Sequence, residues 1–257
     1  MGKKRPSENK KPLFRRPLPH QSHPQPPTEI IMTETEYRAR FNEDQAVGWE
    51  AIDAALEKIY GDTEPRHYGS IISYRLGGED PLDGTSIYDC NEQSFHRHLV
   101  SYGMSSLYFD PENAGNEYSG WGFEFTARIA PCAEDETYNG AEHEPIWVIN
   151  VMNKLGRYVF ESGKWFDSYH FIPANGPIRL DSDTALVGFA FAPDPKLPTL
   201  ATPNGEVQFL QLVGLTQSEL DWLWQDPTRT RCRELIDKMR ADNPLLITDL
   251  HRSKSHV

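Results

Sequence analysis

The chain has 257 residues and a formal net charge of -12, and residues 1–31 hold seven Lys and Arg against two Glu. The rest therefore carries a formal charge of -17, which would repel phosphates over a Debye length and excludes nucleic acid as the expected partner. No apolar run approaches the roughly 20 residues that span a bilayer, and the N-terminus lacks the apolar core of a secretory signal. We therefore expect a cytoplasmic protein without membrane contact.

The first 31 residues are rich in Pro, Lys, Arg and His. Such a segment buries too little apolar surface to offset its chain entropy, which predicts a disordered basic tail over 1–31. The remaining elements follow one another without a long linker, so we expect a single domain over 32–257. Cys90, Cys132 and Cys232 have neither metal nor redox spacing, which is typical of thiols in a reducing compartment.

The first ordered elements after the tail are predicted to be helical. Thr33 and Glu36 have the spacing of a capping box, and Asn42 with Gln45 repeats that spacing. Apolar residues at helical intervals follow, which predicts one helix of about five turns from roughly 43 to 60.

A β-rich region comes next. Its β-branched and aromatic residues predict strands over 68–76, 85–90 and 98–104. The clearest strand is 121–130, in which apolar and polar residues alternate, so Glu124, Thr126 and Arg128 face away from the apolar side chains.

The second half of the chain alternates helices with apolar strands. A helix is predicted between Pro145 and Gly163, because proline is tolerated at a helix start and glycine ends helices. The other predicted elements are strands over 184–192, 205–214 and 245–250, with two helices between the last two. This order has no regular βαβ alternation, which predicts a mixed α/β fold with a central mixed sheet flanked by helices.

The stretch RLGGEDPLDGTSIYDC, 75–90, could be a phosphate or calcium loop or a bend in the sheet. It has no G-x-G-x-x-G pattern, no P-loop Lys and no EF-hand spacing of oxygen ligands. Asp80-Pro81 and Asp83-Gly84 are typical of tandem turns, because Pro fixes φ and Asp bonds nearby amides. The structural interpretation is favoured.

His96 and His98 would share one face of a strand and could form a metal pair. No H-E-x-x-H, C-x-x-C or G-x-S-x-G accompanies them, so structural histidines are the favoured interpretation. A metal-dependent hydrolase using His96 and His98 stays the alternative. We otherwise expect no enzyme and no cofactor.

Six stretches of the chain resemble the suppressor of fused (SUFU) family, in that family's order. They are LGGEDPLDGTSIY (76–88), HRHLVSYGMSSLY (96–108), GWGFEFTARI (120–129), LGRYVFESG (155–163), TPNGEVQFLQLVG (202–214) and LLITDLHRS (245–253). Together they cover roughly residues 45–253.

The resemblance implies a SUFU-like fold and a non-catalytic module that binds a protein or extended peptide. Eukaryotic members are two-domain regulators of Hedgehog signalling that clasp a peptide as an added strand, and this chain resembles their N-terminal domain. As a stand-alone domain, this chain resembles the bacterial members of the family, which have been proposed as immunity proteins against toxins of polymorphic secretion systems. The resemblance therefore favours an immunity-like inhibitor, with a basic toxin as a possible partner, over a Hedgehog-type regulator; the oligomeric state stays open.

The resemblance also points to binding residues. Tyr158 matches a peptide-contacting tyrosine of the family, and Asp194 matches the aspartate of a Glu-Asp-Pro segment whose glutamate is Pro193 here. A second family aspartate falls at Tyr169 and His170, so that acidic contact is absent. An exposed sheet edge can accept an extended peptide, with aromatic side chains as anchors, although Trp165 and Phe166 are better interpreted as packing residues.

Overall fold

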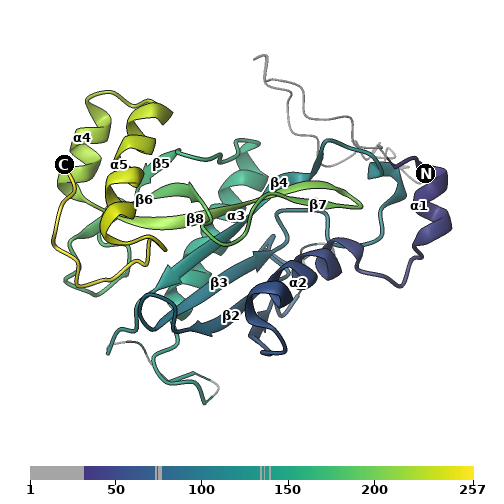
Figure 1. Ribbon diagram of the computed structural model, residues 1–257, viewed down its shortest axis with the longest axis horizontal. Coiled ribbons are helices and arrows are strands. Elements are labelled where there is room, and N and C mark those ends of the chain that lie inside the picture. Colours follow the sequence, from purple (N-terminus) through teal and green to yellow (C-terminus); the bar gives the residue numbers. More distant parts are fainter. Residues whose placement is uncertain (1–31, 73, 75–76, 134, 136, 139) are drawn as a thin grey trace, which may run out of the picture.

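The computed structural model describes residues 32–72, 74, 77–133, 135, 137–138 and 140–257. These residues form one eight-stranded sheet with helices on both faces (Figure 1), which confirms the predicted mixed fold. The predicted tail over 1–31 lies outside the described residues, and the single domain over 32–257 stays a prediction.

The sheet is mixed because one central pair of strands is parallel. Its strands are β1 (Arg66–Gly69), β2 (Gly84–Cys90), β3 (His96–Tyr102), β4 (Tyr118–Ile129), β5 (Phe171–Pro173), β6 (Leu186–Pro193), β7 (Leu200–Thr202) and β8 (Gly205–Thr216). They lie in the order β1-β2-β3-β4-β8-β6-β5, and β7 forms a hairpin with the start of β8. The pair β4 and β8 is parallel, and the other pairs are antiparallel.

Helices cover the two faces differently. The helices are α1 (Glu34–Arg40), α2 (Val47–Tyr60), η2 (Pro111–Asn113), α3 (Ile146–Ser162), α4 (Gln217–Trp224) and α5 (Arg229–Asp242). The apolar side of α3 packs against β4, β6 and β8 on one face. On the other face, α2 covers β2 and β3, while α4 and α5 cover β6 and β8 (Figure 1). That second face therefore holds two apolar clusters with a strip of sheet between them.

The predicted helix over 43–60 is in fact shorter and is preceded by a second helix. The Thr33 capping box starts α1, as predicted. The side chain of Asn42 accepts a hydrogen bond from Asp44 N at 3.0 Å, and the amide of Asn42 donates to Gln45 Oε1 at 3.0 Å. These bonds close a turn between the helices, because Asn side chains often bond the backbone two residues ahead. Helix α2 therefore begins only at Val47.

Two predicted strands are wrong in part. The strand over 68–76 ends at Gly69: the amide of Ser70 still donates to Asp83 O at 2.9 Å in the register of β1 and β2, but residues 71 and 72 lie in a bend. Residues 73, 75 and 76 of this prediction lie outside the described residues. The segment 245–250 makes only one β-bridge, from Thr248 to Ile129. Leu246 adopts a positive φ of 52°, which no β-strand allows, so tertiary contacts override strand propensity here.

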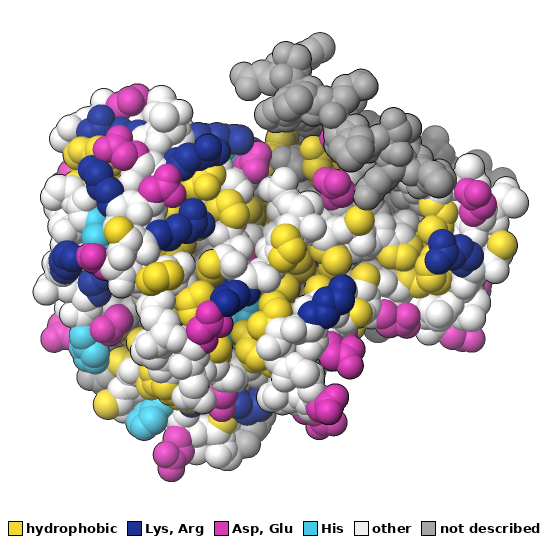
Figure 2. All heavy atoms as spheres, in the orientation of Figure 1, with side chains coloured by type: hydrophobic (Ala, Val, Ile, Leu, Met, Phe, Trp, Pro, Cys, Tyr) yellow, Lys and Arg dark blue, Asp and Glu magenta, His cyan; other side chains and the backbone are white. Residues whose placement is uncertain are grey.

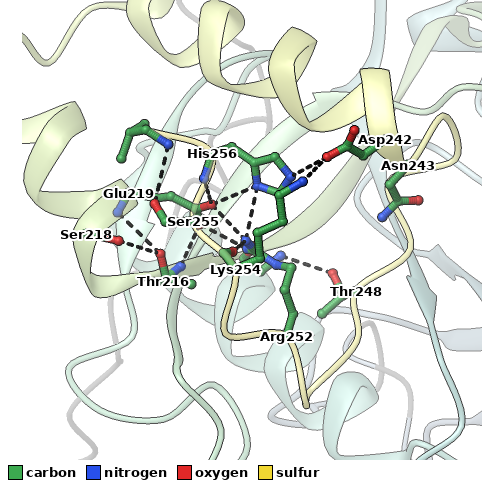
Figure 3. A network of polar contacts seen from close by, with 12 residues as sticks. Thr216, Ser218, Glu219, Asp242, Asn243, Thr248, Arg252, Lys254, Ser255 and His256 are labelled. Atoms are coloured by element: carbon green, nitrogen blue, oxygen red, sulfur yellow. Dashed lines mark hydrogen bonds and ion pairs between the residues drawn. The ribbon is translucent and has the colours of Figure 1, made fainter.

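The end of the chain is held by a polar network around Glu219 (Figure 3). A capping box of Thr216 and Glu219 starts α4. The guanidinium of Arg252 donates to both carboxylate oxygens of Glu219, at 2.7 and 2.9 Å, and to Gly214 O at 2.7 Å. Because the Glu219 side chain is fully buried, this bidentate ion pair holds the segment around Arg252 against the start of α4.

Candidate functional site

Strand β5 forms one outer edge of the sheet. Ile172 lies opposite Phe189 of β6, and Ala174 N donates to Val187 O at 2.8 Å. Peptide groups of an antiparallel strand alternate in direction, so those of Phe171 point away from β6. Among the described residues, nothing pairs with the N–H and C=O of Phe171, so they are available as a template for another strand.

The residues before β5 form a tight turn with an unusual backbone. The amide of His170 donates to Asp167 O at 3.1 Å, and Tyr169 adopts a positive φ of 67°. Tyr169 N donates to Phe191 O at 2.6 Å, and Phe191 N donates to His170 O at 2.9 Å, so these two residues before β5 together oppose one residue of β6. The left-handed position of such a bulge is normally occupied by glycine. The bulky Tyr169 at this position therefore marks a strained backbone at the entry to β5.

On the α5 side, aromatic rings and a guanidinium surround the entry to β5. The Phe171 ring meets the Trp224 ring edge-on, with centroids 4.9 Å apart, and Trp224 is 53% exposed. The guanidinium carbon of Arg233 lies 4.6 Å from the centroid of the Tyr169 ring. Sequence reasoning missed Phe171, Trp224 and Arg233, because nothing in the spacing of 169, 224 and 233 connects them.

On the α3 side, the site residues continue into the core. Tyr158 on α3 is 45% exposed, and its ring lies 5.8 Å from that of Phe166. Phe166 is buried and stacks on Phe191 at 4.3 Å, so it packs in the core as favoured above. Trp165 is only partly buried against the same cluster. The structure thus places Tyr169 and His170 at the entry to β5, and Tyr158 on α3 beside Phe166, which packs on the neighbouring strand β6.

Asp194 lies elsewhere, in a buried polar cluster between α2 and α5. Its Oδ2 accepts hydrogen bonds from Thr126 Oγ1 at 2.8 Å and from Arg128 at 2.5 Å. Its Oδ1 accepts from the amides of Lys196 and Leu197, at 2.8 and 3.0 Å. The Asp194 side chain is fully buried, so this carboxylate has no direct access to a partner and instead holds the turn after β6.

His98 completes this cluster, and its protonation follows from its neighbours. Burial, aided by the charge of Arg128, lowers the pKa of His98 to about 4, so the ring is neutral at pH 7. Its Nε2 donates to Asp194 Oδ2 at 3.2 Å, while Nδ1 accepts from the Tyr60 hydroxyl at 2.7 Å. Burial opposes ionisation of Asp194, but His98 and Arg128 outweigh it and hold the pKa of this carboxyl below its usual range.

The geometry does not favour the metal-dependent hydrolase. His96 and His98 share a face of β3, as predicted, but both are fully buried. Both nitrogens of His98 are engaged, and His96 Nδ1 donates to Ser94 O at 2.8 Å. Across the described part of the chain, no group of three His, Cys, Asp or Glu is placed to hold a metal ion.

The bend between β1 and β2 is a scaffold element where the structure describes it. Asp80 forms an ion pair with Arg157 of α3, and Gly77 has a positive φ of 95°. Residues 75 and 76 lie outside the described residues. None of the described helices is long and apolar enough to cross a bilayer.

The geometry defines a class: an α+β fold built on one mixed sheet, with an open edge at β5 beside aromatic side chains. A family model described as Suppressor of fused protein matches residues 78–253. The curated human and mouse proteins named Suppressor of fused homolog are each 33% identical over 220 residues, covering 81% of this chain and 44% of their own length. The chain thus spans less than half the length of these relatives.

Solved structures agree with that match. A chain in the crystal structure of the Sufu–Fu complex has a TM-score of 0.72 at 29% identity, over 82% of this chain and 93% of that one. Drosophila Suppressor of Fused has a TM-score of 0.71 at 28% identity, over 84% and 52%. A putative SUFU homolog from Neisseria gonorrhoeae FA 1090 shares the fold, with a TM-score of 0.53 at 17% identity, over 82% and 97%. This chain belongs to the suppressor of fused family.

Proposed function

We propose that this chain is a non-catalytic protein-binding module that captures an extended segment of a partner as a new strand beside β5. One observation carries the proposal. Strand β5 ends the sheet, the outward peptide groups of Phe171 have no partner in the part of the chain that the structure describes, and the candidate residues Tyr169 and His170 lie directly before this strand. Main-chain hydrogen bonds would supply affinity, and the side chains on the two faces of the edge would supply selectivity.

The other candidate residues have different roles in this proposal. Tyr158 is half-exposed on the α3 side and would contact the partner directly. Asp194 is buried and would act as a positioning residue, because it holds the turn that follows β6. The relative in the Sufu–Fu complex, which is bound to Fu, supports protein binding as the common activity.

The finer role that we propose is that of a cytoplasmic, immunity-like inhibitor of a toxin. It rests on the resemblance to stand-alone bacterial members. Its test is growth rescue: a toxin encoded beside this gene should arrest a host, and co-expression of this chain should restore growth. Rescue by a variant that has lost the β5 edge would place inhibition on another surface. A Hedgehog-type regulator stays the alternative role.

The edge is tested by replacing Phe171 with proline. Phe171→Pro removes the outward N–H without removing a bond to β6, and proline is tolerated at sheet edges for this reason. Phe171→Ala is the matched control, since it also loses the ring but keeps the N–H. Peptides selected from a displayed library of 12-residue sequences by the wild-type chain should bind Phe171→Ala and lose most of their affinity for Phe171→Pro.

Thermal unfolding of both variants shows whether the fold is kept, and titration calorimetry measures the affinity. Equal binding of the selected peptides to both variants, with equal melting temperatures, would remove β5 as the docking strand. Repeated selections that yield no binding peptide would count against a peptide-binding function altogether.

A further inference from the structure

The charges around the β5 edge differ from those of the whole molecule. The body is strongly acidic, which by itself favours a basic partner. Yet the first half of α5 carries Arg229, Arg231 and Arg233, and two of these border the turn before β5. Figure 2 shows several dark blue side chains, with magenta ones among them, at the upper left, where Figure 1 places α4 and α5. Short-range selectivity at the edge therefore depends on these local charges and not on the net charge, because charges beyond about 10 Å are largely screened.

Arg233 is the cation best placed to meet a docked strand. Its side chain is exposed, and it lies over the ring of Tyr169, two residues before Phe171. Within the described residues, Arg233 forms no ion pair, and its contact is with the ring. A guanidinium over an aromatic face keeps its N–H donors available at the edge of the ring for a carboxylate.

The nearby carboxylates already have cationic partners. Asp167 pairs with Arg229 at 3.0 Å, Glu234 with Lys238 at 3.0 Å, and Asp237 with Arg240 at 3.4 Å. An added carboxylate next to Arg233 would therefore meet an unmatched positive charge. An added lysine or arginine would be repelled there, since like charges in contact are unfavourable.

Side-chain alternation determines which residues of a docked strand reach Arg233. Phe171 faces α4 and α5, while Ile172 packs with the cluster on the α3 side. Every second residue of a strand paired with β5 would thus face Trp224, Tyr169 and Arg233. An extended peptide can place an acidic side chain on that side without disturbing those on the other.

We propose that the strand captured beside β5 is acidic: it presents an Asp or Glu side chain to Arg233 on the α5 side of the edge. This inference rests on the proposed function and specifies its ligand. The negative net charge of the chain is compatible with this ligand, because binding needs a carboxylate at one position of the captured strand and not an acidic partner surface throughout.

The probes are three acetylated eight-residue peptides in which Thr alternates with Glu, Gln or Lys. Because these residues alternate with Thr, all the Glu, Gln or Lys side chains lie on one face of the extended peptide. Whenever that face is turned toward α5, one of these side chains lies near Arg233. For the full wild-type chain, we expect the affinity order Glu, then Gln, then Lys. Arg233→Gln should weaken the Glu peptide about fivefold, as for one exposed ion pair, and leave the Gln peptide unchanged.

Arg231→Gln is the matched control, because the Arg231 guanidinium lies over Trp222, 3.9 Å from the ring centroid. It should leave the Glu peptide's affinity unchanged. Equal affinity for the Glu and Gln peptides, or equal effects of Arg233→Gln and Arg231→Gln, overturns this inference. If the same peptides nevertheless bind Phe171→Ala and not Phe171→Pro, the proposed function stands. Binding of none of the three peptides overturns the inference, and the library selection then decides separately whether any peptide docks at β5.

Discussion

Arg128 heads the largest fully buried side chains of the described residues. One nitrogen of its guanidinium donates to Asp194 at 2.5 Å and to Gln211 Oε1 at 2.6 Å. The second terminal nitrogen, Nη2, has no hydrogen-bond partner among the described residues. A buried charge needs a matching charge, so Asp194 must stay ionised and His98 is held neutral beside this pair.

His98 gives the fold a calculable dependence on pH. The groups around the ring are Tyr60 on α2, His96 on β3, Arg128 on β4 and Asp194 after β6. The folded pKa of about 4 lies below the ordinary value near 6.5. The stability that His98 contributes is thus fully present above about pH 6.5 and is lost as the pH falls toward 4.

We expect His98→Gln to lack this loss, because Gln keeps a donor to Asp194 but does not titrate. Between pH 6.5 and 4, the unfolding free energy of the wild type should fall by about 3 kcal/mol more than that of the variant. Urea unfolding at several pH values measures it. His251→Gln, at an exposed position, should behave like the wild type. Parallel curves for wild type and His98→Gln would mean that His98 titrates normally.

Residue roles could be predicted from sequence only where they depend on local geometry. The pairing of His96 and His98 on one face follows from strand alternation. The burial of Asp194 could not be predicted, because it depends on Arg128, 66 residues away, and on coverage of the second sheet face by α2 and α5. Arg233 likewise reaches Tyr169 only through the packing of α5.

At the scale of elements, the polar network around Glu219, which joins α4 to the end of the chain, can be tested by substitution. Arg252→Ala leaves the buried Glu219 carboxylate without its guanidinium, which should cost about 3 kcal/mol of unfolding free energy. Lys254→Ala removes an exposed ion pair with Asp242 from the same network (Figure 3) and should cost less than about 0.5 kcal/mol. Urea unfolding of the two variants compares them. Similar costs for both would show that Arg252 is no more than a surface charge.

Element boundaries were predictable where a local signal fixes them. The capping boxes at Thr33 and Thr216 start α1 and α4, and Gly163, with a left-handed φ of 68°, ends α3. The segment 245–250 was predicted as a strand from its apolar residues. It instead turns around Asn243, whose side chain accepts a hydrogen bond from Ile247 N at 3.0 Å. Only the tertiary contacts of this segment decide its conformation.

For the whole molecule, the tail over 1–31 is the part most open to test. The composition of 1–31 predicts a segment that buries little apolar surface. We therefore expect a chain that starts at Met32 to melt within about 1 °C of the full chain, since such a segment adds little stability. Differential scanning calorimetry of both proteins at equal ionic strength measures the difference. A drop of several degrees would show that the tail packs on the fold.

The matched charges under α2 and α5 restrict how this sequence can drift. Replacing Arg128 alone would leave the buried carboxylate of Asp194 without its cation, and replacing Asp194 alone would leave the buried guanidinium without its carboxylate. Either intermediate pays a folding penalty that the double replacement avoids. Mutations at positions 128 and 194 should therefore be inherited as a pair, and their covariation among descendants would record that this cluster is one evolutionary unit.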